Sequence, residues 1–370
     1  MRAAFASTGQ AAAFASLLLV FLLLPLLLRE GNLPSRDQIY SAMLWDNGAY
    51  PYIHQQIFEE KGDIDIAFVG PSHLWQDIHT PYVQEQLSKR LGHPAVVRSL
   101  CWGGGGFDAL YFITQDLLEH RKVRMLVIYD STNDNNQIND KARSWFRWGD
   151  NAKALNGLPL QIKANYYLAS IIGMPRVLLE LIRSNFPVDP TTSNNNYWAT
   201  ADHADDFTSS LGSLVMRAGF GLSTYAEHAP FEEYTPSTST TSADVLVYSP
   251  ETRDSFNFKV GAVPEWQLHF ARKFADLSED RGCKLVLLHL PTMSEARSPV
   301  IQEKAFWPDI MHSDLTMVGI IPARLFAGLT DEDLYKLYGD MGHMNKNGQF
   351  YFTPLVTPSL LDIYEGTTHH

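Results

Sequence analysis

The chain has 370 residues, a formal net charge of −12 and two cysteines. The acidic balance disfavours nucleic acid as a partner, because nucleic acids are bound through clustered Lys and Arg, and it also disfavours a strongly anionic polymer. Two cysteines cannot form the disulfide framework of a small secreted domain. About 340 residues follow the amino-terminal segment, which fits one α/β domain that carries a large insertion.

The amino-terminal segment contains an uncharged, Leu-rich run from Ala11 to Leu28. A membrane-spanning helix needs roughly 17 to 25 such residues, whereas the core of a cleavable signal peptide has about 7 to 15 and ends at a small-residue site. A buried core helix is the other alternative, but such helices are seldom apolar on every face. We expect a cytoplasmic amino terminus at 1–10 and a signal anchor at 11–28.

Residues 29–61 are predicted to form a stalk and a lead-in helix, and residues 62–370 to form the domain. Short apolar runs alternate with helical patterns, as in a doubly wound parallel sheet of an α/β protein. The predicted strands are Ile64–Gly70, Ala95–Cys101, Val123–Tyr129 and Lys284–Leu290, with helices at 82–91, 107–120 and 266–279. Cys101 ends one strand and Cys283 begins another, which places them at opposite edges as free thiols.

The first strand runs into Gly70-Pro71-Ser72-His73. Open α/β sheets place their sites at the carboxyl ends of strands, so Ser72 is a candidate nucleophile. A serine hydroxyl needs a base to remove its proton before it becomes reactive. The alternative is that Ser72 only caps the following helix.

The next two strands end in the glycine run 103–106 and in Asp130-Ser-Thr-Asn133-Asp134. Glycines let backbone N–H groups approach a ligand, which suits an oxyanion hole, and no Gly-Lys-Ser/Thr follows as in a phosphate loop. Asn133 can donate a further hydrogen bond to an oxyanion. The alternatives are a flexible loop for the glycines and an Asx-turn for Asn133.

Residues from about 140 to 262 interrupt the alternation as a predicted insertion. Its apolar stretch from Leu160 to Phe186 contains Gly173 and Pro175, and the proline predicts two short helices in place of one. The stretch either packs its apolar face on the sheet or contacts the membrane or a membrane partner. On the second interpretation, a docking surface for a multi-span partner is expected, because an exposed apolar patch otherwise favours aggregation.

The carboxyl-terminal motif is Asp340-Met-Gly-His343-Met-Asn345. At i and i+3, Asp340 can contact Nδ1 of His343 and leave Nε2 for Ser72, as in a Ser-His-Asp triad. His73 is the rival base, but it should point away from its neighbour along an extended chain, so a substrate contact is expected for it and for Asn345. Neither His-Glu-x-x-His nor paired Cys-x-x-Cys is present, so no metal or cofactor is expected.

The order of these motifs resembles the SGNH (GDSL-like) hydrolase superfamily over roughly residues 62–136 and 263–360, with the insertion outside the match. The resemblance implies that Ser72 is the nucleophile and that Asp340 and His343 complete the triad. It also implies an oxyanion hole formed by the Ser72 N–H with Gly104 or Gly105 and Asn133. The chain departs from the simple secreted members in having Gly-Pro-Ser in place of Gly-Asp-Ser.

With its amino-terminal span, the Ser72-His73 pair and the Asp-x-x-His-x-Asn ending, the chain looks like the membrane-anchored branch that includes the teichoic acid D-alanylation and alginate O-acetylation proteins. This implies an acyltransferase that O-acetylates a cell-envelope or secreted polysaccharide beside a membrane-bound O-acyltransferase. The expected location is the bacterial cytoplasmic membrane, with the domain in the periplasm or outside the cell. The alternatives are a glycan O-acetyl esterase and a non-catalytic glycan-binding scaffold.

Overall fold

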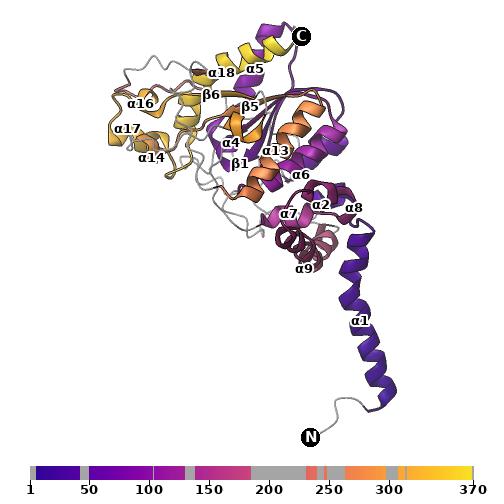
Figure 1. Cartoon of the computed structure of the whole chain (residues 1–370). Coiled ribbons are helices and arrows are strands. Elements are labelled where there is room, and N and C mark those ends of the chain that lie inside the picture. Colours follow the sequence, from indigo (N-terminus) through magenta and orange to yellow (C-terminus); the bar gives the residue numbers. More distant parts are fainter. Residues whose placement is uncertain are drawn as a thin grey trace.

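A six-stranded sheet in the order β2-β1-β3-β5-β6-β4 lies at the centre of the fold (Figure 1). The structure, a computed structural model, describes residues 6–41, 50–102, 104–129, 138–184, 231–239, 246–247, 263–296, 307–312 and 315–368. The strands are β1 (Ile64–Pro71), β2 (Val97–Trp102), β3 (Val123–Tyr129), β4 (Leu246–Val247), β5 (Lys284–Leu288) and β6 (Thr316–Gly319). Five strands are parallel, and the edge strand β4 is antiparallel to β6.

The strand order explains why the apolar runs of the sequence do not alternate with polar residues. The chain passes from β1 to β2 on one side and returns to β3 on the other, as in doubly wound sheets. Both faces are covered, so every residue of Ile64–Gly70 is buried. The α/β class and the four predicted strands are confirmed, whereas β6 and β4, with four and two residues, were not predicted.

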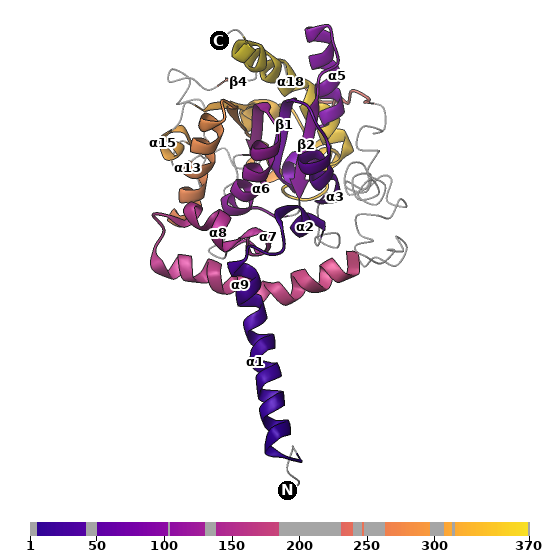
Figure 2. The ribbon, with the colours of Figure 1, turned by 90° about the vertical axis from the view of Figure 1, so that its right-hand side faces the viewer.

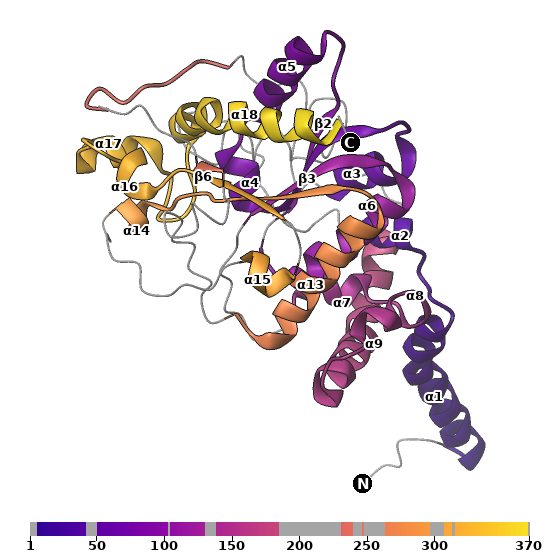
Figure 3. The ribbon, with the colours of Figure 1, turned by 45° about the horizontal axis from the view of Figure 1, so that its top comes forward.

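Helices cover both faces of the sheet (Figures 1 and 3). One face carries α5 (Thr80–Leu91) and α18 (Lys346–Thr368), and the other carries α6 (Phe107–His120) and α13 (Glu265–Asp280). Apolar residues spaced one turn apart hold α6 and α13 together, and the rings of Phe112 and Phe270 lie 5.7 Å apart. Five short helices complete this part: α4 (Ser72–Asp77), α14 (Met293–Ala296), α15 (Trp307–Met311), α16 (Pro322–Leu325) and α17 (Asp331–Leu337).

The amino-terminal helix α1 (Thr8–Glu30) projects away from the domain (Figures 1 and 2). In the part of the chain that the structure describes, it is the one helix long and apolar enough to cross a membrane. Its 23 residues span about 35 Å at 1.5 Å per residue, enough for a hydrocarbon core of about 30 Å. This length and exposure fit the predicted anchor.

The segment expected to form a stalk packs into the domain. It contains α2 (Arg36–Ser41), α3 (Tyr50–His54) and the π-helix η1 (Gln55–Glu59). Ile39, Tyr40 and Ile57 are almost completely buried. Apolar side chains of this size gain roughly 1.5–3 kcal/mol each from burial, which favours docking over an extended stalk.

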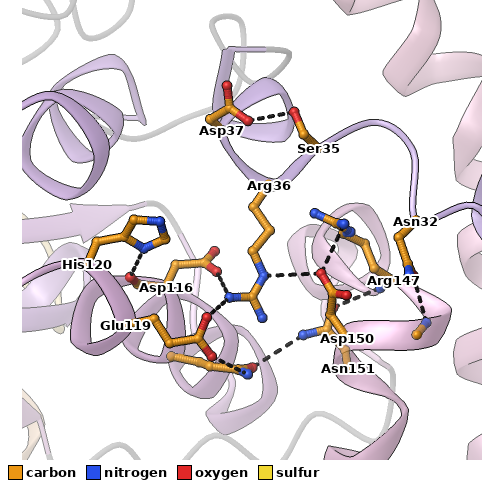
Figure 4. A network of polar contacts seen from close by, with 12 residues as sticks. Asn32, Ser35, Arg36, Asp37, Asp116, Glu119, His120, Arg147, Asp150 and Asn151 are labelled. Carbon is orange, nitrogen blue, oxygen red and sulfur yellow. Dashed lines mark hydrogen bonds and ion pairs between the residues drawn. The ribbon is translucent and has the colours of Figure 1, made fainter.

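Polar contacts also fasten this segment to the domain (Figure 4). Arg36 lies 2.9 Å from Asp116 and 3.6 Å from Asp150, and it also pairs with Glu119. These carboxylates belong to α6 and to α8 (Trp148–Asn151). Because Asp116 is buried and its charge is paired, the start of α2 is held against two elements of the domain.

Residues 160–184 of the apolar stretch form one helix, so the prediction of two short helices was wrong. After α7 (Asp140–Trp145), α8 and η2 (Ala152–Leu155), the chain forms α9 (Leu160–Ser184) with Pro175 inside it. An interior proline costs about 3 kcal/mol. The buried stripe of α9 continues across it, through Tyr166, Ser170, Met174 and Val177, so packing outweighs the lost hydrogen bond.

Candidate active site

Ser72 is the first residue of α4, directly after β1. The N-cap position belongs to Pro71, and no side chain caps this helix. The Ser72 hydroxyl lies 2.9 Å from Nε2 of His343, a residue 271 positions further along the chain. The capping alternative is therefore not the arrangement that the structure shows, and the hydroxyl is joined to the predicted base.

His343 is held on its other side by Asp340. The Asp340 Oδ2 and Oδ1 atoms lie 2.8 and 3.1 Å from Nδ1 of His343. The backbone N–H groups of Gly342 and His343 each donate to Oδ1 at 2.7 Å. Partial burial opposes the charged carboxylate, but these N–H groups and the imidazole lower the pKa of Asp340. An ionised Asp340 accepts from Nδ1–H, which leaves Nε2 free to accept the Ser72 proton.

The Asp340–His343 loop is braced by backbone contacts and by Asn345. Gly339 N–H donates to the His343 carbonyl at 3.0 Å. The Asn345 amide donates to the carbonyls of Lys336 and Tyr338, and its oxygen accepts from the backbone N–H groups of 347 and 348 in the first turn of α18. Asn345 therefore caps α18 and closes the loop, in contrast to the substrate contact expected for it.

Two further contacts join α4 to the end of this loop and to α18, and the sequence predicted neither. The Met344 N–H donates to Asp77 at 2.9 Å, and the Gln349 side chain donates to the Gln76 carbonyl at 2.9 Å. Asp77 is completely buried, and burial raises its pKa well above the usual range. Nothing in the sequence separates Asp77 from the other carboxylates, because only the tertiary structure buries it.

His73 is stacked between two rings of the site. Its ring centroid lies 4.1 Å from that of His343 and 4.9 Å from that of Tyr129. The expectation that His73 points away from its neighbour was wrong, because Ser72 and His73 open a helix and the chain is not extended there. Burial, and then the neighbouring His343, lower the pKa of His73 to about 4, so its ring is neutral near pH 7.

The glycine turn after β2 has a conformation that only glycine readily adopts. Gly104 has φ of +90° and Gly106 of +139°. A Cβ at Gly106 would lie 2.6 Å from an Asp108 oxygen. Gly103 and Asn133 lie outside the described residues, so the oxyanion hole expected from Ser72, Gly104 or Gly105 and Asn133 stays a prediction.

Asp108, two residues after the glycine turn, accepts hydrogen bonds from three other segments of the chain, and the sequence did not predict this role. The carboxylate is fully buried and accepts from the Gln267 amide at 3.1 Å, the Tyr166 hydroxyl at 2.9 Å and the Asn139 N–H at 3.0 Å. Burial raises the pKa of Asp108. The hydrogen bonds favour the charged form and oppose this effect, but burial is the larger cause. The glycine turn is thereby connected to α13 and to α9.

A small pocket opens at the carboxyl ends of β1, β2 and β3, beside Pro71. It contains about 380 Å³ of space that protein atoms do not fill, part of it open to solvent. Its lining is mainly apolar and consists of Val69, Pro71, Trp102, Gly105, Gly106, Phe107, Leu110, Tyr129 and Gln267. Gly105 of the glycine turn and Tyr129, which stacks on His73, both line it, so the pocket adjoins the Ser72 site.

Within the described ranges, no group of three His, Cys, Asp or Glu side chains could hold a metal ion. Compared with known proteins, the chain matches no protein-family model and no curated protein sequence. The SGNH resemblance therefore rests on the motifs and on their order in the chain. Chemically, the arrangement is a hydroxyl, an imidazole and a carboxylate joined in series, the order needed to activate a serine.

Proposed function

We propose that the protein is a membrane-anchored acyltransferase that O-acetylates a cell-envelope or secreted polysaccharide through an acyl-serine intermediate. The observation that carries the proposal is the continuous series of contacts from Ser72 Oγ through His343 to Asp340. If the contacts of Ser72 and Asp340 were unrelated, they would not have to use the two different nitrogens of the same His343 ring. A series that uses both nitrogens supports proton transfer through His343.

The reaction proceeds in two displacements. Ser72 Oγ attacks the carbonyl carbon of an acyl ester or thioester donor while His343 Nε2 takes the hydroxyl proton. The bond to the donor's leaving group breaks, and His343 returns the proton to that group. A glycan hydroxyl then attacks the acyl-serine and gives its proton to His343, and Ser72 is released with the proton restored.

The pocket supports an acyl group as the transferred unit. Its mainly apolar walls favour a hydrocarbon substituent such as the methyl group of an acetyl. The same intermediate gives an esterase if water attacks in place of the glycan hydroxyl. A scaffold that only binds glycan does not require the serine to touch the imidazole, so the geometry favours chemistry over the scaffold.

The anchor supports a function at the membrane. A helix suited to span the bilayer and docked directly on the domain would keep Ser72 close to an acyl donor delivered from the membrane. We therefore propose the bacterial cytoplasmic membrane as the location, with the domain on its outer side. The proposed partners are a membrane-bound O-acyltransferase as donor and a polysaccharide as acceptor.

The test uses the full chain in lipid nanodiscs with an activated acetyl ester and an oligosaccharide acceptor. We expect Ser72→Ala to lose labelling by a fluorophosphonate probe and to lower acetyl transfer on the order of 10³-fold or more. Ser35→Ala, which changes a serine outside the site, is the matched control. Acetyl release without acetylated acceptor would identify an esterase, and unchanged activity in Ser72→Ala would exclude the acyl-serine mechanism.

A further inference from the structure

The outward side of α9 carries four large exposed apolar side chains, unlike that of an ordinary surface helix. Leu168, Ile172, Leu179 and Ile182 are 56%, 77%, 48% and 59% exposed. Their spacing of 4, 11 and 14 residues from the first places them on one side of the helix. The opposite side is already buried against the domain. Packing on the domain therefore accounts for the buried side of α9 and leaves these four apolar side chains exposed.

The position of α9 relative to α1 indicates what covers this face. In Figure 2, α9 runs crosswise to α1 at the end where α1 meets the domain, and the domain lies on the far side of α9. The exposed face of α9 is therefore turned toward the side on which α1 extends. A bilayer spanned by α1 would have its surface at the level of α9.

Arg29 fixes this arrangement. It is the penultimate residue of α1 and is completely buried. Its Nε donates to the Ser170 carbonyl of α9 at 3.2 Å, and its Nη2 donates to the Ser144 carbonyl at 3.5 Å. Further along the chain, Arg36 at the start of α2 forms ion pairs with α6 and α8 (Figure 4). The end of α1 is thus clamped to α9 and to the domain.

We propose that α9 lies in the boundary between headgroups and acyl chains of the bilayer that α1 spans, with Leu168, Ile172, Leu179 and Ile182 in contact with lipid. Interfacial helices bind in this way, with the apolar face buried and the helix axis in the membrane plane. A bilayer is favoured over a protein partner because the apolar face and the helix that crosses the membrane point to the same side. The proposal does not depend on the chemistry of Ser72.

This arrangement fixes the domain at two points and sets its orientation. A single span allows the domain to rotate and tilt above the membrane, whereas a helix lying in the interface restricts both motions. Tyr166 of α9 donates to Asp108 beneath the glycine turn, so the same helix is connected to the site by a buried hydrogen bond. The candidate site is thereby held at a constant height above the bilayer.

The experiment places one fluorophore at a time on the full chain in nanodiscs of phosphatidylethanolamine and phosphatidylglycerol. Ile172→Cys and Leu179→Cys carry the label on the outward face of α9. Lys89→Cys is the matched control, on exposed α5 at the far side of the domain from α1 (Figure 1). The native Cys101 and Cys283 are buried, which raises the pKa of each thiol to about 12 and protects both from labelling.

Lipids with a nitroxide near the top of the acyl chain then report contact. We expect labels at Ile172 and Leu179 to lose most of their fluorescence, and the label at Lys89 to keep it. Equal, weak quenching at all three positions would overturn the proposal. A label on α9 that is shielded from water but not quenched by the lipid would also overturn it, because a protein would then cover the face.

Discussion

His73 offers the most direct test of the stacked arrangement at the site, through the pH dependence of stability. Its ring is enclosed by His343 and Tyr129, and its pKa is about 4 against an ordinary value of 6.5. Burial is the largest cause, the neighbouring His343 adds to it, and Asp340 opposes it. The folded protein therefore resists protonation of this ring.

The magnitude follows from linkage. Between pH 4 and 6.5 the unfolded chain binds more protons at His73 than the folded chain does. The contribution of His73 to the free energy of unfolding is therefore fully present above pH 6.5 and is lost as the pH falls through this window. Between about pH 8 and about pH 5, this one group removes about 2 kcal/mol from the free energy of unfolding. Below its folded pKa the loss levels off at about 3 kcal/mol.

His73→Phe keeps a flat ring in the stack and removes the titration. Urea unfolding of the full chain in nanodiscs, followed by tryptophan fluorescence, is measured for both proteins at each pH. Between about pH 8 and about pH 5, we expect the free energy of unfolding of the variant to fall by about 2 kcal/mol less than that of the natural chain. His93→Phe, which changes an exposed histidine, serves as the control and should keep the original pH dependence. The same pH dependence in His73→Phe as in the natural chain would refute the enclosed, neutral His73.

Asp340→Asn should lower acetyl transfer by about 10⁴-fold with the fold intact, because an amide does not hold His343 in the required tautomer. Single-turnover rates measure this effect. A rate near that of the natural chain would show that Asp340 takes no part in the mechanism. Tyr166→Phe should reduce the free energy of unfolding by about 1–3 kcal/mol, because the buried Asp108 loses one of its donors. Urea titration checks it, and an unchanged midpoint would contradict the role of that hydrogen bond. Leu110→Ala should enlarge the pocket and shift the preferred ester from acetyl toward longer chains. A chain-length series of nitrophenyl esters measures the shift, and an unchanged preference would place the acyl group elsewhere.

The sequence by itself determined the elements whose signal is local. The strand at 64–71 is a mainly apolar run in which Asp65 is the one charged residue, and the helix at 107–120 repeats its apolar residues at helical spacing, so both were predicted to within one residue. Asp340 and His343 lie three residues apart, and a single turn brings them together whatever the rest of the chain does. The amino-terminal helix was evident because eighteen uncharged residues need no partner to identify them.

Only the tertiary structure decided features that depend on contacts between distant segments. The continuity of α9 through Pro175 comes from the surface on which the helix packs, which local propensity does not describe. His73 faces His343 because Ser72 begins a helix, and Asp77 supports the loop only because folding buries it against Met344. A substrate contact was predicted for Asn345, whereas in the structure both the nitrogen and the oxygen of its amide form hydrogen bonds with the backbone. In each case the deciding term is burial or a hydrogen bond across a long sequence separation, which no local pattern encodes.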